Sequence, residues 1–459
     1  MSKFASLCIA SLLVLPQAPA IAQPGTTQQL DAALYPYFKA DAPGATVIVV
    51  KDGKTLFRKA YGMADVSNGF AMQPGAQHRI ASITKQFTST AIMMLAEEGR
   101  LSVDDDITKH LPDFPTQGRK ITIEHLLTHT SGIPSYSRGF TFFLTMWRDK
   151  SVADIIDSMK GEPLMFEPGT RYAYNNSGYF LLGAIIEKVS GLPYAKFVEQ
   201  RIFTPLGMRD TAFEGYEKRK TLRAVGHTDG ILPGYSSSWP LSMSQAYAAG
   251  ALVSTVDDMA RWDAAITSGK LLSAAGWQRA FTPYRLKDGS FTRYGYGWSL
   301  GDVQGSPKIG HGGAINGFLS YSLRLPQEKV YVAVLSNSDS GLPHAEMLAG
   351  RLTAIAIGRP YPAFKPVALP TTELDKFVGA YRVDADTVRT FSRSGDRLYM
   401  QRTGRDKLEV VPYGPDRFFV PDTLTHMQFV RDASGKASAV TVRQNFGSDT
   451  NPRGAAAAN

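Results

Sequence analysis

Cysteine is almost absent from this chain, which has one, Cys8, among 459 residues. Cys8 lies within residues 1–22, where Lys3, the apolar stretch Phe4–Leu15 and the small-x-small site Ala20-Ile21-Ala22 predict a cleaved export signal. The mature chain would then contain no cysteine, which excludes a disulfide, a thiol nucleophile and a thiolate metal site. We therefore expect a periplasmic or secreted protein.

Long apolar runs and long basic runs are also missing. No stretch after residue 22 reaches the length of a membrane span, so we expect no integral membrane segment once the signal is removed. The net charge of +9 is spread along the chain, without a Lys/Arg run or a basic motif interleaved with aromatics. This pattern argues against nucleic-acid binding.

The composition, 43% hydrophobic and 20% charged residues, is typical of a globular protein, and the length predicts more than one domain. Strand-like runs at 45–50 and 55–61 flank the hairpin signal Asp52-Gly53, and strand-like runs return after about residue 290. Helical patterns lie between them. For residues 23–358 we therefore predict an α/β (α+β) domain in which both ends of the segment build one sheet around a helical insert.

The remainder of the chain, residues 359–459, has a different sequence pattern. Residues 359–371 carry four prolines and predict a stiff linker. Residues 372–446 contain short alternating runs separated by turn residues, which predict a small antiparallel β domain, either a sandwich or a barrel. Residues 447–459 are small and polar, and we expect a flexible tail.

One short motif, Ser82-x-x-Lys85, has the composition of an activated nucleophile. Apolar residues recur at helical spacing after Ser82, so Ser82 and Lys85 are expected to share one helical face. A serine hydroxyl is a poor nucleophile until a base takes its proton, and a lysine can be that base where its pKa is lowered. No other serine in the chain has a lysine three residues later.

Two later motifs supply possible partners. Tyr174-x-Asn176 stands at a helix entry, and His311-Gly312-Gly313 stands at the start of a strand region. Each also has an ordinary structural interpretation. Asn176 or Ser177 would cap the helix, and the glycines beside His311 would form a tight turn.

Taken in order, the three motifs resemble those of the penicillin-recognising serine hydrolases, whose first and third motifs are S-x-x-K and K-T-G. The Tyr-x-Asn form of the second motif resembles the branch of class C β-lactamases, D-Ala-D-Ala carboxypeptidases, D-aminopeptidases and β-lactamase-like (family VIII-type) esterases. The stretch His125–Pro134 is also similar to one common in that family. The resemblance covers about residues 27–357. It implies a β-lactamase/transpeptidase-like fold, with a helical subdomain against an antiparallel sheet and, outside that range, a lipocalin-like C-terminal domain.

The resemblance implies an acyl-enzyme mechanism without a cofactor. Ser82 would attack the acyl carbon, and either Lys85 or Tyr174 would take its proton. Asn176 would orient Lys85 or a substrate amide. The backbone N–H groups of Ser82 and Ala314 would form the oxyanion hole.

Other catalytic centres fit the sequence less well. His125 and His129 are four residues apart, as in a metalloprotease helix, but Leu126 stands where that helix needs glutamate and no third ligand is evident. We therefore predict no metal site. The absence of a G-x-S-x-G motif argues against an α/β-hydrolase.

The third motif departs from the family pattern, because His311 replaces the lysine that contacts the substrate carboxylate. This change disfavours β-lactams and favours an ester, an amide or a D-amino-acid peptide. A β-lactamase or carboxypeptidase remains the alternative, as does a non-catalytic binding or sensor relative. We expect a small-molecule or peptide substrate and allow for a homo-oligomer. The residues expected to line the cleft are Gly312, Gly313, Phe142, Trp147, Tyr235 and Trp239.

Overall fold

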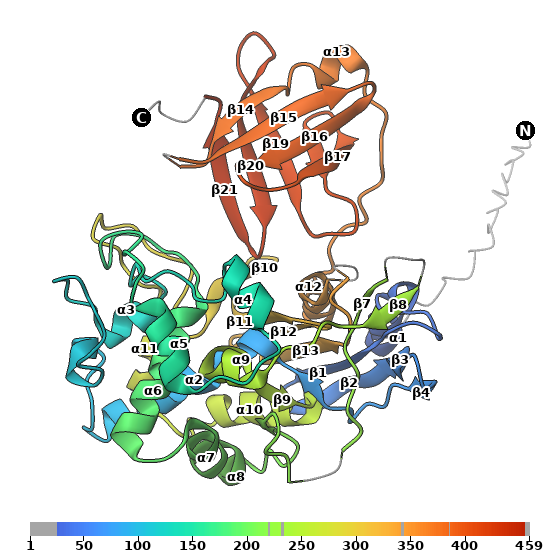
Figure 1. Cartoon of the computed structure of the whole chain (residues 1–459). Helices are drawn as coiled ribbons and strands as arrows, with labels where there is room; N and C mark the ends of the chain where they lie inside the picture. Colours follow the sequence, from blue (N-terminus) through green and yellow to red (C-terminus); the bar gives the residue numbers. More distant parts are fainter. Residues whose placement is uncertain (1–24, 219–220, 231–233, 341–343, 385, 455–459) are drawn as a thin grey trace, which may run out of the picture.

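A computed structural model describes residues 25–218, 221–230, 234–340, 344–384 and 386–454, which form a large domain and a smaller β domain (Figure 1). The predicted export signal, residues 1–22, lies outside the described residues. Within the described ranges, no helix has the length and apolar character needed to cross a membrane.

The large domain is organised around a six-stranded antiparallel sheet with the order β10-β11-β12-β13-β1-β2. Its strands are β1 (Ala45–Lys51), β2 (Lys54–Tyr61), β10 (Ser299–Val303), β11 (Ser306–Ile315), β12 (Phe318–Leu325) and β13 (Val330–Ser336). β1 pairs with β13, so strands from the two ends of the domain meet in the middle of the sheet. This confirms the predicted fold class.

Side-chain alternation along the central strands gives the sheet two apolar faces. Ile48 and Ala333 point into the core that also holds α10 (Val256–Thr267), whereas Val47 and Val334 point into the core that holds α1 (Thr26–Ala32) and α12 (Ala345–Ala356). The helical subdomain extends the first of these cores. It contains α2 (Thr84–Glu97), α3 (Ile123–Leu127), α4 (Phe140–Thr145), α5 (Val152–Met159), α6 (Asn176–Ser190), α7 (Tyr194–Val198), α8 (Thr204–Leu206), α9 (Met243–Gly250) and α11 (Ala274–Ala280).

Short elements connect the two parts. The brief helical turns are η1 (Tyr35–Tyr37), η2 (Ala81–Ile83), η3 (Ile107–Lys109) and η4 (Glu199–Phe203). The short strands are β3 (Met63–Asp65), β4 (Phe70–Ala71), β5 (His78–Arg79), β6 (Ala212–Phe213), β7 (His227–Asp229), β8 (Tyr235–Ser237) and β9 (Leu252–Ser254).

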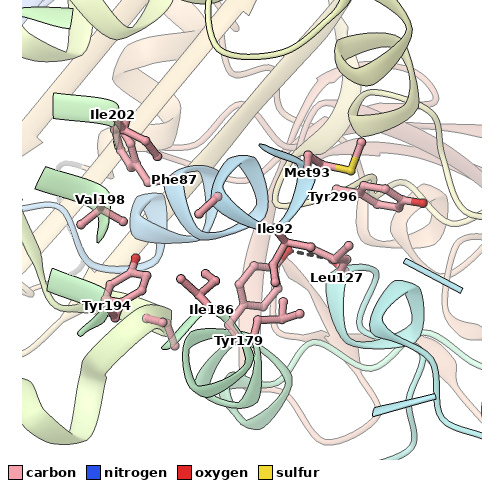
Figure 2. Close-up of a cluster of buried hydrophobic side chains, with 14 of the residues drawn as sticks. Phe87, Ile92, Met93, Leu127, Tyr179, Ile186, Tyr194, Val198, Ile202 and Tyr296 are labelled. Atoms are coloured by element: carbon pink, nitrogen blue, oxygen red, sulfur yellow. Dashed lines mark hydrogen bonds between the residues drawn. The ribbon is translucent and has the colours of Figure 1, made fainter. Parts of the chain in front are cut away.

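Helix α2 runs through the centre of the helical core, where all residues from Thr84 to Leu95 are buried. Figure 2 shows Phe87 and Ile92 of this helix among side chains from α6 and α7. In the same cluster the Tyr179 hydroxyl donates a hydrogen bond to the carbonyl oxygen of Leu127 (2.7 Å). The element that carries the Ser-x-x-Lys motif at its start is therefore held by packing along most of its length.

The C-terminal domain is an eight-stranded antiparallel sheet in which the strands follow chain order, as expected for a lipocalin-like up-and-down barrel. After the short helix α13 (Thr371–Leu374), its strands are β14 (Gly379–Arg382), β15 (Val388–Ser394), β16 (Arg397–Arg402), β17 (Lys407–Gly414), β18 (Arg417–Phe419), β19 (His426–Arg431), β20 (Ala437–Gln444) and β21 (Gly447–Pro452). A bridge between Tyr381 and Arg453 brings the first and last strands together.

The predicted flexible tail is wrong for residues 447–452, which form β21. Their polar composition lacks the alternation typical of a strand, but β20 supplies the backbone partners, with Val440 opposite Asn451. The side chain of Asn451 is buried as a result. Residues 455–459 of that tail lie outside the described residues.

The turn between β20 and β21 joins the two domains. Phe446, at the tip of this turn, is buried against the ring of Tyr321 with the centroids 5.6 Å apart, and its backbone carbonyl accepts a hydrogen bond from Asp302 N–H (2.8 Å). Arg293 adds a hydrogen bond to the Asp449 carboxylate (2.7 Å). The barrel is thus docked on the end of the six-stranded sheet near β10 (Figure 1).

Candidate active site

The turn η2 presents Ser82 directly before α2. Ser82 is partly exposed, whereas Lys85, one turn later, is fully buried. Ala81 has φ of 48°, a left-handed conformation that residues with a side chain seldom adopt. Such a residue costs about 1–3 kcal/mol and persists where the surrounding structure holds it, often at a functional site. The backbone thus turns sharply just before the hydroxyl.

The Lys85 amine lies at the centre of the site. Its Nζ is 3.0 Å from Ser82 Oγ, 3.0 Å from Asn176 Oδ1 and 2.8 Å from the carbonyl oxygen of Ala249. Burial holds the pKa of Lys85 well below its usual range. A neutral amine has two N–H donors and one lone pair, so it can donate to Asn176 and Ala249 and accept the hydroxyl proton of Ser82. The three contacts match the needs of a neutral base.

Tyr174 places its ring beside the same amine, with Lys85 Nζ 4.9 Å from the ring centroid. Its hydroxyl is buried and makes no full hydrogen bond within the described part of the chain. Burial raises the pKa of Tyr174 above its usual value, and the nearby Ser82 hydroxyl opposes part of that rise. The phenol therefore keeps its proton at neutral pH and is available as an acid.

Asn175, and not Asn176 or Ser177, caps helix α6. The Oδ1 atom of Asn175 accepts a hydrogen bond from Gly178 N–H (2.9 Å), while Ser177 donates to the carbonyl oxygen of Pro134 (2.7 Å). The capping interpretation of Asn176 or Ser177 is therefore wrong. Asn176 is left to hold Lys85 through Oδ1 and to donate from Nδ2 to Ser137 Oγ (2.9 Å).

His311 is buried and neutral. Its Nδ1 lies 2.6 Å from the carbonyl oxygen of Gly312, so this nitrogen donates, and Nε2 accepts from the Tyr294 hydroxyl at 2.7 Å. Burial is the main cause that lowers the pKa of His311, to about 3. The third motif therefore supplies no cation at neutral pH.

The strand β11 packs tightly against the turn before Ser82 at Gly313. A Cβ atom on Gly313 would stand 2.2 Å from the carbonyl oxygen of Ile80, 2.4 Å from Ser320 Oγ and 3.1 Å from Ala81 Cβ. Ala314 follows as an exposed residue that pairs with Leu319. This close approach is consistent with the expected oxyanion hole of Ser82 and Ala314 N–H groups, which stays a prediction.

Gly313→Ala is expected to lower kcat/KM at least tenfold, because the added methyl group forces β11 away from a backbone carbonyl that cannot yield by rotation, at a cost of about 1–3 kcal/mol. Gly312→Ala is the matched control, since its Cβ would meet only the ring of Tyr321, at 3.0 Å. Initial rates and thermal unfolding of both variants test this. Equal rates in the two variants would contradict the proposal that catalysis needs the close approach of β11 at Gly313 to the turn before Ser82.

The sequence did not reveal several residues that complete the site. The ring of His129 packs on that of Tyr174, with centroids 4.2 Å apart and the planes tilted by 45°, and its Nδ1 accepts a hydrogen bond from Asn175 N–H (3.3 Å). Tyr294 holds His311, and Ala249 holds Lys85 through a backbone atom. The stretch His125–Pro134 was the one available signal for His129.

A metal role for His125 and His129 has no support in the structure. His125 Nδ1 accepts from Thr122 N–H (3.1 Å) within the cap of α3, whereas His129 turns towards Tyr174. Across the described ranges, no group of three or more His, Cys, Asp or Glu side chains is arranged to hold a metal ion.

The ring contacts of the expected wall residues Trp239 and Phe142 are to other aromatic residues, Phe143 and Tyr136. Phe143 reaches Trp239, with ring centroids 6.2 Å apart, and Asn316, just after β11, donates to the carbonyl oxygen of Trp239 (3.0 Å). Phe142 instead packs on Tyr136, with centroids 6.0 Å apart. The side chains of Trp147, Tyr235 and Trp239 are exposed.

Comparisons with known proteins agree with this geometry. The Beta-lactamase family matches residues 25–356. Penicillin-binding protein 4* of Bacillus subtilis (strain 168) is 30% identical over 412 residues, which span 84% of this chain and 89% of that protein. The structure of the octameric penicillin-binding protein homologue from Pyrococcus abyssi has a TM-score of 0.67 at 26% identity, covering 93% of this chain and 98% of that one. A D-stereospecific amidohydrolase from Streptomyces sp. has a TM-score of 0.58 at 27% identity, covering 73% and 97%. The chain therefore belongs to the Beta-lactamase family and is a serine hydrolase.

Proposed function

We propose that this protein is an exported hydrolase that acts on an ester, an amide or a D-amino-acid peptide through a covalent acyl-enzyme formed on Ser82. The observation that carries this proposal is the position of the buried Lys85 amine, 3.0 Å from the Ser82 hydroxyl, with two carbonyl acceptors as its other partners. A base in hydrogen-bond contact with a serine is the arrangement that activates the nucleophile.

The steps follow from the proton positions. Ser82 Oγ attacks the acyl carbon while Lys85 takes the hydroxyl proton, and the tetrahedral oxyanion is stabilised by the N–H groups of Ser82 and Ala314. Tyr174 donates its proton to the leaving group as the acyl–leaving-group bond breaks, and Lys85 re-protonates Tyr174. Water then attacks the acyl-enzyme with the same groups acting in reverse, which returns Ser82 to its hydroxyl form.

The third motif favours substrates that do not need a carboxylate anchor there. His311 is neutral and both its nitrogens are engaged, so it offers no fixed positive charge. The similarity to a D-stereospecific amidohydrolase supports an amide or D-amino-acid substrate. The similarity to penicillin-binding proteins keeps a D-Ala-D-Ala carboxypeptidase or a β-lactamase as the alternative. The octameric state of the Pyrococcus abyssi protein supports self-association of this chain.

A short substrate panel tests the proposal. The purified protein is assayed with p-nitrophenyl butyrate, D-Ala p-nitroanilide, nitrocefin and a D-Ala-D-Ala peptide. We expect turnover of the ester or the anilide, with kcat/KM for nitrocefin at least about tenfold lower, because a charge-assisted contact to the carboxylate is missing. No turnover of any substrate and no labelling of Ser82 by a fluorophosphonate would favour a non-catalytic binding relative.

A further inference from the structure

A cavity of about 320 Å³ adjoins the second catalytic motif. Its walls include the apolar side chains of Tyr136, Phe142 and Met159. Two further lining residues, Ser135 and Arg138, belong to the loop that contacts the catalytic residues. Ser135 Oγ accepts a hydrogen bond from Asn176 N–H (3.2 Å), and Arg138 Nη2 donates to the backbone carbonyl of Tyr174 (3.4 Å). The cavity and the Tyr174-x-Asn176 motif are therefore joined through the loop that carries Ser135 and Arg138.

The position of this cavity is fixed from two sides. Gln245 of α9 also lines it and donates to the carbonyl oxygens of Thr145 (2.6 Å) and Arg148 (2.7 Å), which ties the end of α4 to α9. The same helix α9 supplies the Ala249 carbonyl that holds Lys85. Gln245 and Ala249 lie on either side of a kink at Tyr247, so the cavity wall and the acceptor of the Lys85 amine belong to one short segment.

Arg138 gives this side of the site a permanent positive charge. Its guanidinium carries five N–H donors, and the hydrogen bond to the Tyr174 carbonyl oxygen uses one end of the group, so donors remain for a ligand. Within the described part of the chain, Arg138 makes no ion pair and its side chain is exposed. The cavity lining also includes Lys150 and one carboxylate, Glu162, which leaves a net positive lining.

We propose that this cavity binds the acyl part of the substrate and that Arg138 binds a carboxylate at the far end of that acyl group. The proposal rests on the acyl-enzyme function proposed above. The apolar wall suits the methylene chain of a dicarboxylic half-ester or of an acidic acyl group, and the guanidinium suits bidentate contact with its carboxylate. In this proposal Arg138, beside the second motif, supplies the positive charge for the substrate carboxylate. The neutral His311 of the third motif does not supply it.

Two chain-matched esters test the proposal: mono-p-nitrophenyl glutarate, which ends in a carboxylate, and p-nitrophenyl pentanoate, which ends in a methyl group. For the native protein we expect kcat/KM to be about tenfold or more higher for the glutarate ester, because a charge-assisted hydrogen bond forms only with that substrate. Arg138→Gln is expected to bring the ratio close to one, and Arg138→Lys to retain part of it. Higher ionic strength is expected to lower the ratio in the native protein.

The control is Arg148→Gln, which removes an exposed arginine that lies over the ring of Trp147 and outside the cavity lining. Its ratio is expected to equal that of the native protein. A native ratio near one, or a ratio that Arg138→Gln leaves unchanged, would overturn the inference while leaving the hydrolase function intact. An equal loss for both esters in Arg138→Gln would also overturn it, because Arg138 would then act by positioning Tyr174. Failure of both esters to react in a Ser82-dependent way would instead refute the proposed function.

Discussion

Ser82→Ala is expected to abolish hydrolysis, with a fall in kcat on the order of 10⁴-fold or more, since removing the nucleophile of such a unit leaves only binding and oxyanion stabilisation. The fold is expected to survive. Ser82 is partly exposed, and its hydroxyl is one of three partners of Lys85, so the Asn176 and Ala249 contacts remain. Initial rates with a reactive p-nitrophenyl ester, together with thermal unfolding, measure the two effects separately.

A control serine lies in the helix that follows Ser82. Ser89 is buried in α2, and its hydroxyl donates to the backbone carbonyl of Gln86 (3.0 Å). Ser89→Ala is expected to keep its rate and its fluorophosphonate labelling, whereas Ser82→Ala loses both. Hydrolysis by Ser82→Ala at a near-native rate would end the assignment of this residue as the nucleophile.

Only the contact between closely spaced side chains of the candidate site could be predicted from the residues themselves. Ser82 and Lys85 share one turn of a helix, so their contact follows from local geometry. The arrival of Asn176 at Lys85 required the resemblance to a family, because nothing local connects residues 91 positions apart. The neutrality of His311 depends on burial and on Tyr294, and neither can be read from the motif itself.

Features that depend on backbone atoms could not be predicted from the sequence, for a different reason. Ala249 acts through its carbonyl oxygen, which every residue type has, so its sequence carries no sign of the role. Likewise β21 forms because β20 offers backbone partners, although its own residues are polar and small. Alternation and turn residues predicted the antiparallel C-terminal domain but left sandwich or barrel open, and the resemblance to the family was needed for the lipocalin-like form and for the antiparallel sheet of the large domain.

Three residues with a side chain and a positive φ angle lie beside the proposed catalytic groups. Ala81 precedes Ser82, the ring of His129 packs on that of Tyr174, and Tyr247 lies two residues before Ala249; their φ angles are 48°, 59° and 40°. Each such residue costs about 1–3 kcal/mol and persists only where the surrounding structure holds it.

Lys85→Ala and Tyr174→Phe are each expected to lower kcat/KM by several orders of magnitude, about 10³-fold or more, because each removes a proton carrier from the acylation step. Their effects on stability are expected to differ. Lys85→Ala leaves the buried carbonyl oxygens of Asn176 and Ala249 without this donor, at about 1–3 kcal/mol for such a group. Tyr174→Phe removes a hydroxyl that makes no full hydrogen bond within the described residues, so its unfolding temperature is expected to stay close to native.

The pH dependence of kcat/KM decides which group takes the proton of Ser82. Burial lowers the pKa of Lys85 and raises that of Tyr174, which widens the pH range in which a neutral amine and a protonated phenol can coexist. Activity is then expected to rise with pH as Lys85 loses its proton, to level off well below the ordinary lysine pKa of about 10.4, and to fall only in alkali as Tyr174 ionises. In Tyr174→Phe, the residual activity is expected to keep the rise at low pH (the acid limb of the profile) and to lose the fall in alkali. In Lys85→Ala, the rise at low pH is expected to disappear. If Tyr174→Phe instead lost the acid limb, the phenolate would be the base and Lys85 would act as a cation beside it.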